Sequence, residues 1–239
     1  MSNVSGSGNQ DSRPLDRGVI TRSVLNSVMR GGKFNVCSVN IQSVSAGSKM
    51  DELRFILSGS KASLVVVSET WANSRVSDDF LAVDGYKFMR HDRIRRRGGG
   101  LVVYCSLGVV WALVEKSSAD CATEYMAVEL RFDGRKFLVF AVYNPPGTPG
   151  FVELLGSKMR CFQSCYDDVF VVGDLNLDFS VSSFLLGIFL TSMVLLIILM
   201  GQPIFRLCLP RRLIILRRVF LIDSWLLARL TARTSLGMI

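Results

Sequence analysis

A strand of apolar residues that ends in polar ones is the feature that most constrains this chain. Residues 169–172 are apolar and rich in β-branched side chains, which predicts a strand buried on both faces. Gly173 allows the backbone to turn directly after this strand. Asp174 and Asn176 then follow two positions apart, so on extended chain they project to the same side. The sequence therefore predicts a carboxylate and an amide together at the end of a core strand.

This pair of side chains has two interpretations. An aspartate can hold a metal ion or take a proton from water, and an asparagine amide can donate to a phosphate oxygen without adding negative charge. The alternative is that Gly-Asp-Leu-Asn is only a polar turn after a core strand. Polar partners arriving at the same place from elsewhere in the chain favour the first interpretation.

The first part of the chain supplies such partners. Residues 34–39 predict a strand that ends at Asn40, and residues 64–67 predict a second strand that ends before Glu69. Between them, Lys49–Leu57 has the apolar spacing of a helix. Two strands joined by a helix normally run parallel, so we expect Asn40 and Glu69 at the same edge of one sheet.

The later sequence alternates between further strands and one helix. An Asp-Gly pair at residues 133–134 is typical of a hairpin turn. Tyr143 stands at a strand end, where a phenol can hydrogen-bond a phosphate or simply pack half-buried. This order of elements predicts an α/β sandwich. Its strands are expected at residues 85–90, 101–106, 111–115, 125–132 and 137–143, and its helix at residues 151–165.

The loop predicted at residues 91–100, HDRIRRRGGG, combines arginines with three consecutive glycines. A guanidinium group binds two phosphate oxygens at once, which suits a nucleic-acid backbone. A solvated charged loop is the other interpretation, and the single histidine, His91, is assigned to the same loop. The candidates for binding nucleic acid are Arg93, Arg95, Arg96 and Arg97.

Composition sets both ends of the chain apart from its centre. Residues 1–32 are rich in Ser, Gly, Asn and Arg and are predicted to form a mobile leader. The net charge of +8 comes mainly from residues 179–239, which hold seven arginines against one aspartate. Six scattered cysteines and one histidine argue against a zinc site. Scattered cysteines of this kind are typical of reduced thiols, which predicts an intracellular protein of the nucleus or cytoplasm.

The tail at residues 180–239 is apolar and rich in arginine, and it has three interpretations. Residues 181–200 have the length and hydropathy of a transmembrane helix, and the arginines that follow place its end in the cytoplasm. A frameshift or a mis-joined gene is the second explanation. The third is buried core of the same domain, although the tail lacks the turn signals that separate strands.

Taken in order, the motifs resemble the endonuclease/exonuclease/phosphatase superfamily. Within it, residues 33–179 are similar to the endonuclease domain of non-LTR retrotransposons of insect type. The motifs that carry the likeness are VCSVNIQS with Asn40, VVVSETW with Glu69, RRRGGGLVVY, VYNPPG with Tyr143, and VVGDLNLDF with Asp174 and Asn176.

This resemblance implies a deoxyribonuclease I-like fold of four layers, with two facing β-sheets flanked by helices. It also implies a phosphodiesterase, dependent on Mg²⁺ or Mn²⁺, that nicks DNA to prime reverse transcription. The implied partners are DNA and the reverse transcriptase of the parent element. The implied roles are metal binding by Glu69 with Asn40, orientation or deprotonation of water by Asp174, stabilisation of the transition state by Asn176 and a phosphate contact by Tyr143.

The chain departs from the family in one respect. Family members continue for several more strands and end in an Asp-His pair, which this chain lacks. The resemblance therefore implies a domain that is truncated at its C-terminus and impaired in activity. Two other functions stay open: an inactive, membrane-tethered relic that serves as a binding module, and a phosphoinositide phosphatase of the same superfamily. The glycine and proline motifs favour the retroelement branch over the phosphatase.

Overall fold

The computed structural model describes Met29 and residues 34–94, 98–118, 120–176 and 220–222. Most of its strands and helices lie within two residues of the predicted ones. A short helix, α3, was not predicted, and it begins where the Ser77 hydroxyl accepts a hydrogen bond from the amide of Phe80. The elements in order are β1 (Val36–Asn40), α2 (Lys49–Leu57), β2 (Leu64–Ser68), α3 (Asp78–Leu81), β3 (Tyr86–His91), β4 (Leu101–Ser106), β5 (Val110–Lys116), β6 (Glu124–Phe132), β7 (Arg135–Tyr143), α4 (Phe151–Phe162), the 3₁₀ turn η1 (Gln163–Cys165), β8 (Asp168–Asp174) and β9 (Phe220–Ile222).

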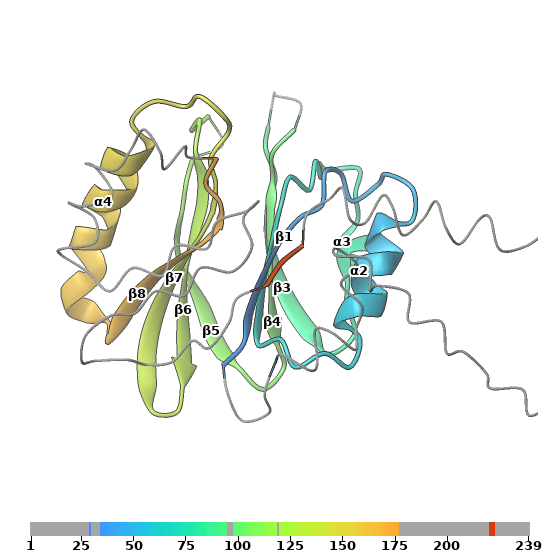
Figure 1. The fold of residues 1–239 in the computed structure, drawn as a ribbon, viewed down its shortest axis with the longest axis horizontal. Coiled ribbons are helices and arrows are strands. Elements are labelled where there is room, and N and C mark those ends of the chain that lie inside the picture. Colours follow the sequence, from blue (N-terminus) through green and yellow to red (C-terminus); the bar gives the residue numbers. More distant parts are fainter. Residues whose placement is uncertain (1–28, 30–33, 95–97, 119, 177–219, 223–239) are drawn as a thin grey trace, which may run out of the picture.

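The strands form two mixed sheets that face each other. The first sheet has the strand order β3-β4-β2-β1-β9, and the second has the order β5-β6-β7-β8. Helices α2 and α3 lie on the outer side of the first sheet and α4 lies on the outer side of the second (Figure 1). The predicted four-layer α/β sandwich is therefore confirmed.

Each sheet contains one parallel pair joined through a helix. Strands β1 and β2 are parallel across α2, with Asn40 opposite Ser68. Strands β7 and β8 are parallel across α4, with Tyr143 opposite Asp174. This arrangement confirms that Asn40 and the residue after Ser68 leave the first sheet at the same edge.

An apolar layer between the sheets forms the central core. On β2, β4, β6, β7 and β8 the inward residues recur at every second position, as expected of a strand packed on both faces. The outer faces are covered by helices, with Leu53 of α2 on the first sheet and Met159 of α4 on the second. The buried members of the central layer include Val36, Leu64, Val66, Leu101, Val103, Met126, Val128, Leu130, Val139, Phe170 and Val172.

The assignment of His91 to a loop is wrong. His91 is the last residue of β3, pairs with Leu101 of β4 and is 6% exposed. Its Nε2 lies 2.9 Å from the hydroxyl of Ser117, and burial lowers the pKa of the imidazole. Backbone pairing with Leu101 includes His91 in the strand, and the Ser117 hydroxyl satisfies its buried ring.

The predicted leader and tail lie almost entirely outside the described residues, and so does the predicted membrane helix at residues 181–200. Within the described part of the chain, no helix is long and apolar enough to cross a membrane. Met29 is buried and belongs to the apolar cluster that also contains residues of the first sheet and α2. The backbone of β9 pairs in parallel with β1, so three residues of the tail extend the first sheet.

Gly173 is the position in β8 where a side chain is least acceptable. Its φ is +141°, and a Cβ there would overlap the carbonyl oxygen of Val142 on the neighbouring strand. We expect Gly173→Ala to lower the free energy of unfolding, measured by urea denaturation, by about 1–3 kcal/mol or more. Gly108→Ala is the matched control, because a Cβ at Gly108 meets no atom within 4 Å. An equal, small effect of both substitutions would contradict the steric argument.

Candidate active site

Polar residues occupy one row of each sheet at the edge where β1, β2, β7 and β8 end. In the first sheet, Asn40 pairs with Ser68. In the second, Glu124 pairs with Tyr143, which in turn pairs with Asp174. Each of these residues lies an even number of positions from an apolar residue of the central layer on the same strand, so its side chain faces the same way. Together they form the last row of that layer. The apolar layer between the sheets is therefore bordered, at this edge, by polar side chains.

Two interactions connect the two sheets within this set, one hydrogen bond and one electrostatic interaction. The amide Nδ2 of Asn40 donates to Oδ2 of Asp174 at 2.8 Å. The phenol of Tyr143 lies close enough to the side chain of Glu69, the residue that follows β2, for the Glu69 charge to raise the pKa of the phenol. The structure therefore brings together Asn40, Glu69, Tyr143 and Asp174, which are far apart in the sequence.

The surroundings of Asp174 raise the pKa of its carboxyl group and so make it a weaker acid. It is 4% exposed, and burial raises the pKa of its carboxyl group. The hydrogen bond from Asn40 acts in the opposite direction, whereas the negative charge of Glu69 raises the pKa further. A carboxylate with a raised pKa has an increased proton affinity, which suits a group that takes a proton from water.

Glu69 and Tyr143 form the second cross-sheet contact. Glu69 is half-buried and has a φ of +53°, which is uncommon for a residue with a side chain. Tyr143 is 6% exposed, and burial together with the nearby Glu69 charge raises the pKa of its phenol. The phenol therefore stays protonated at neutral pH and is able to donate a hydrogen bond.

Asn176 reaches Asp174 by a route that differs from the prediction. The strand β8 ends at Asp174, and Asn176 has a left-handed φ of +44° instead of lying on extended chain. Its side chain and backbone nevertheless lie close enough to Asp174 to lower the pKa of that carboxyl group, and its Nδ2 donates to the carbonyl of Asn144 at 2.9 Å. The expected proximity of the two side chains is confirmed, while the expected extended geometry is wrong.

Asn144 is a residue that the sequence analysis missed. It is 1% exposed, its backbone amide donates to the carbonyl of Asp174 at 2.8 Å, and its Nδ2 donates to the carbonyl of Leu175 at 3.0 Å. Its Oδ1 accepts a hydrogen bond from the Thr123 hydroxyl at 2.9 Å. Asn144 thus ties the turn that carries Asp174 to the neighbouring strands. Its position directly after Tyr143, at a strand end, is the signal that could have identified it.

Of the predicted nucleic-acid-binding arginines, Arg95, Arg96 and Arg97 lie outside the described residues. Arg93 forms an ion pair with Glu124, and its guanidinium lies over the ring of Tyr143, 5.5 Å from the centroid. Only 10% of its side chain is exposed. Arg93 therefore lies beside the candidate site, and its contact with a nucleic acid stays a prediction.

Glu124 is the second residue that the sequence analysis missed. It is 2% exposed, and burial raises the pKa of its carboxyl group while Arg93 lowers it. Its Oε2 accepts a hydrogen bond from the amide of Gly100 at 2.5 Å. The strand alternation could have identified it, because Glu124 is in step with Met126 and Val128 and so faces the interior.

The consecutive glycines have a steric role at this edge. A Cβ on Gly100 would overlap the hydroxyl of Thr70, and a Cβ on Gly99 would overlap the side chains of Arg93 and Glu124. The carbonyls of Gly99 and Gly100 accept hydrogen bonds from the amides of Trp71 and Thr70 at 2.8 and 3.2 Å. The glycines therefore permit close packing against the segment that follows Glu69.

The available oxygen atoms fit a hard divalent cation. Magnesium is commonly held by one or two carboxylates together with substrate phosphates, and Glu69 and Asn40 offer a carboxylate and an amide oxygen. The negative charge of Glu69 raises the pKa of Asp174, and a cation held by Glu69 would weaken this repulsion. In the described part of the chain there is no cluster of three or more His, Cys, Asp or Glu. The donor set fits Mg²⁺ or Mn²⁺ held jointly with a phosphate.

Comparison with other proteins finds no family model and no curated protein that matches the sequence. Several solved structures are similar in part. The catalytic domain of Xenopus laevis APE2 has a TM-score of 0.48 and 17% identity, over 64% of this chain and 65% of that one. Truncated TDP2 of Caenorhabditis elegans has a TM-score of 0.47 and 15% identity, over 61% and 63%.

A third similar structure is an endonuclease/exonuclease/phosphatase family protein from Bacteroides thetaiotaomicron, with a TM-score of 0.46 and 15% identity, over 61% of this chain and 64% of that one. The chain thus spans less than two thirds of the length of these structures. At such identities and TM-scores the likeness assigns neither an activity nor a substrate.

The buried pair of Arg93 and Glu124 generates a prediction about stability. Glu124→Ala leaves a guanidinium without its partner and the Gly100 amide without its acceptor, so we expect a loss of about 3–5 kcal/mol in the free energy of unfolding. Arg131→Ala is the control, because Arg131 is 65% exposed and its pair with Glu129 is worth at most about 1 kcal/mol. Both losses are measured by urea denaturation, and similar values would contradict the proposed burial of the pair.

The raised pKa of Asp174 generates a prediction about pH. A folded-state pKa above the unfolded value makes the ionised group unfavourable for folding at neutral pH, and this cost disappears as the group is protonated in acid. We therefore expect Asp174→Asn, which keeps an acceptor for Asn40, to melt no lower than the wild type at pH 7. The advantage should vanish near pH 4, the usual range of an aspartate. Exposed Asp84→Asn is the control, and a clearly lower melting temperature of Asp174→Asn at pH 7 would refute this account.

Proposed function

We propose that this chain is a metal-dependent phosphodiesterase of the endonuclease/exonuclease/phosphatase type that cleaves DNA. The observation that carries the proposal is the pair of interactions that connect the two sheets, namely the hydrogen bond from Asn40 to Asp174 and the electrostatic interaction between Tyr143 and Glu69. They gather carboxylate, amide and phenol groups at one edge. Such a set can bind a phosphate, a hard cation and an attacking water together.

Each residue has a role that follows from its environment. Asp174, with its raised pKa and Asn40 as orienting donor, accepts a proton from the attacking water. Tyr143, a protonated phenol, donates to a phosphate oxygen. Asn176, which is exposed and held by the carbonyl of Asn144, donates to the phosphate as charge develops on it.

Glu69, together with the amide oxygen of Asn40, would hold Mg²⁺ or Mn²⁺. The bound cation supplies neutralisation of the charge that develops on the phosphate. The backbone of Glu69 is held in place, because its carbonyl accepts a hydrogen bond from the amide of Ser43 at 2.8 Å. A ligand fixed in this way requires little reorganisation during the reaction.

The motifs around these residues support a finer proposal. We infer an endonuclease of the non-LTR retrotransposon type, which nicks DNA and cooperates with the reverse transcriptase of its parent element. We expect it to act in the nucleus or cytoplasm. A membrane-tethered binding module and a phosphoinositide phosphatase are the competing functions, and the first of these depends on residues 181–200.

Plasmid nicking tests the proposal. We expect purified chain to convert supercoiled plasmid to the open-circular form with Mg²⁺ and to lose this activity in a chelator. Asp174→Asn should lower the rate by about 10²- to 10⁴-fold, the usual contribution of a general base. Glu69→Gln should lower the response to Mg²⁺, and Asp84→Asn serves as the control with an exposed acid away from the site.

The competing functions give different results in the same preparation. A phosphatase would release phosphate from a soluble phosphoinositide headgroup with the same dependence on Asp174 but without nicking. A binding module would show neither reaction and would stay with the membrane pellet after an alkaline carbonate wash. Nicking that persists equally in Asp174→Asn would reject the proposed site.

A further inference from the structure

A lysine at the start of α2 binds the backbone directly after Asn40, and the function proposed above does not use it. Lys49 is half-buried and is the first residue of α2. Its Nζ donates to the carbonyl of Ile41 and to the carbonyl of Gln42, each at 2.9 Å. One ammonium group therefore binds two consecutive backbone carbonyls beside the candidate site.

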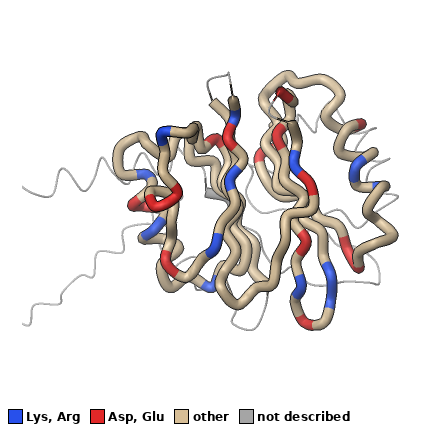
Figure 2. The backbone as a smooth tube through the Cα atoms, turned by 180° about the vertical axis from the view of Figure 1, so that it is seen from behind, with Lys and Arg blue, Asp and Glu red and all other residues tan. Residues whose placement is uncertain are grey.

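Helix formation does not account for a lysine at this position. The N-terminal end of a helix carries a partial positive charge, which favours acidic side chains and disfavours a cation. Asp51 and Glu52 follow this rule in the first turn of α2, whereas Lys49 does not. Basic residues are interspersed with acidic ones over the described part of the chain, so Lys49 is not part of a larger basic surface there (Figure 2). The two carbonyls are the favourable partners that the structure gives this charge.

The two carbonyls belong to a turn with an uncommon conformation. Gln42 and Ser43 have φ values of +46° and +84°, which are left-handed and uncommon for residues with a side chain. Such conformations cost free energy and persist only where the surrounding structure imposes them. Because the carbonyls of Ile41 and Gln42 flank the α-carbon of Gln42, Lys49 restricts both backbone dihedral angles of that residue.

This turn contacts both residues that are proposed to hold the cation. The amide of Gln42 donates to Oδ1 of Asn40 at 3.2 Å, while Nδ2 of Asn40 donates to Asp174 at 2.8 Å. The first bond fixes which way the Asn40 amide points and leaves its oxygen a second lone pair for a cation. The amide of Ser43 donates to the carbonyl of Glu69 at 2.8 Å. The conformation of one turn thus determines the placement of both Asn40 and Glu69.

We propose that Lys49 is a positioning residue of the candidate site, which holds the turn in the conformation that orients the Asn40 amide and the Glu69 backbone. This inference rests on the proposed function and adds a residue to its machinery. Lys49 touches neither the phosphate nor the cation in this role. Its removal therefore leaves substrate binding intact and displaces the groups that hold the cation, and a displacement of about 1 Å is enough to slow a reaction strongly.

The steady-state kinetics of plasmid nicking test the inference. Lys49→Met removes the ammonium group and keeps an unbranched side chain. At a fixed Mg²⁺ concentration we expect kcat to fall by about 10- to 100-fold, the usual effect of losing a group that orients a metal ligand, with little change in the KM for plasmid. Lys49→Arg, which keeps the charge and the donors, should recover part of the loss.

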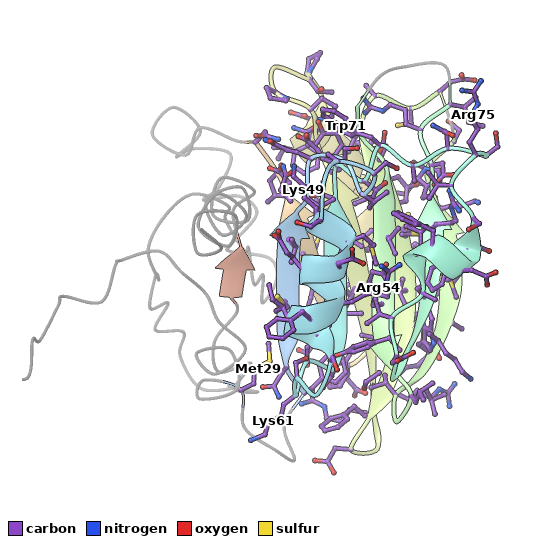
Figure 3. All side chains as sticks on the ribbon, turned by 90° about the vertical axis from the view of Figure 1, so that its right-hand side faces the viewer. Met29, Lys49, Arg54, Lys61, Trp71 and Arg75 are labelled. Carbon is purple, nitrogen blue, oxygen red and sulfur yellow. The ribbon has the colours of Figure 1, made fainter. Side chains whose placement is uncertain are left out.

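Lys61→Met is the matched control, and its kcat should equal that of the wild type. Lys61 is exposed and lies near one end of the molecule, whereas Lys49 lies at the end of α2 that is nearer to Trp71 (Figure 3). The same chemical change is thereby made far from the candidate site.

Hydrogen exchange measures the turn without any reaction. The full chain is exchanged into D₂O in the presence of EDTA, and mass spectrometry compares peptic peptides that cover residues 41–48 with those that cover β2. We expect Lys49→Met to speed exchange in residues 41–48 by about ten-fold or more and to leave β2 unchanged, because the turn opens locally while the core stays folded. Each variant is first melted by circular dichroism. If Lys49→Met does not fold, Lys49→Gln, which keeps a shorter donor, replaces it.

Several results would overturn the inference. They are an unchanged kcat in Lys49→Met, an equal loss in Lys61→Met, and unchanged exchange in residues 41–48. A higher KM with a weaker salt dependence at unchanged kcat would also overturn it, because this result is expected of a lysine that contacts the DNA backbone.

The two measurements separate this failure from failure of the proposed function. Nicking by the wild type, combined with unchanged kcat and exchange in Lys49→Met, rejects the role of Lys49 alone. Faster exchange in residues 41–48 of Lys49→Met, without nicking by the wild type, supports the role of Lys49 in holding the turn and rejects the phosphodiesterase.

Discussion

Buried polar side chains that pair across the two sheets are the constraint on which the candidate site depends. An apolar layer fills the space between the sheets, and at one edge it gives way to Asn40, Tyr143, Glu124 and Asp174. A polar group buried there without a partner costs several kcal/mol, so each requires a hydrogen bond. The partners come from the opposite sheet or the adjoining loop. The same contacts that satisfy these groups also gather them into a site.

Burial of the carboxylates at this edge affects both the stability of the fold and the ability of the groups to accept a proton. Burial that raises the pKa of Asp174 makes its ionised form unfavourable for folding and at the same time more able to accept a proton. The ion pair of Arg93 and Glu124 is different, because each charge there neutralises the other. The Arg93 guanidinium of this pair lies 5.5 Å from the centroid of the Tyr143 ring. One carboxylate at this edge is therefore suited to chemistry and the other to holding the surrounding loop.

Much of the fold and the main residues of the site could be predicted from the sequence. Apolar runs and the spacing of helix α2 identify the strands, and their order predicts the parallel pairs and the edge that Asn40 and Glu69 share. His91, Asn144 and Glu124 were assigned wrongly or missed. Strand alternation and a place at a strand end are local signals for Glu124 and Asn144. The hydrogen-bond partners that satisfy the three buried side chains, namely Ser117, Leu175 and Gly100, are distant in sequence and cannot be predicted from a local pattern.

The sequence by itself determined the period of each strand, and with it which residues face the central layer. It also determined the polar residue at which each strand ends, because these properties are local to a few consecutive positions. Only the tertiary structure decided that Asn40 donates to Asp174, that Tyr143 contacts Glu69, and that the backbone of Trp71 is left-handed. The physical reason is that sheet-to-sheet contacts depend on the register and packing of strands far apart in the chain, which short-range preferences do not specify.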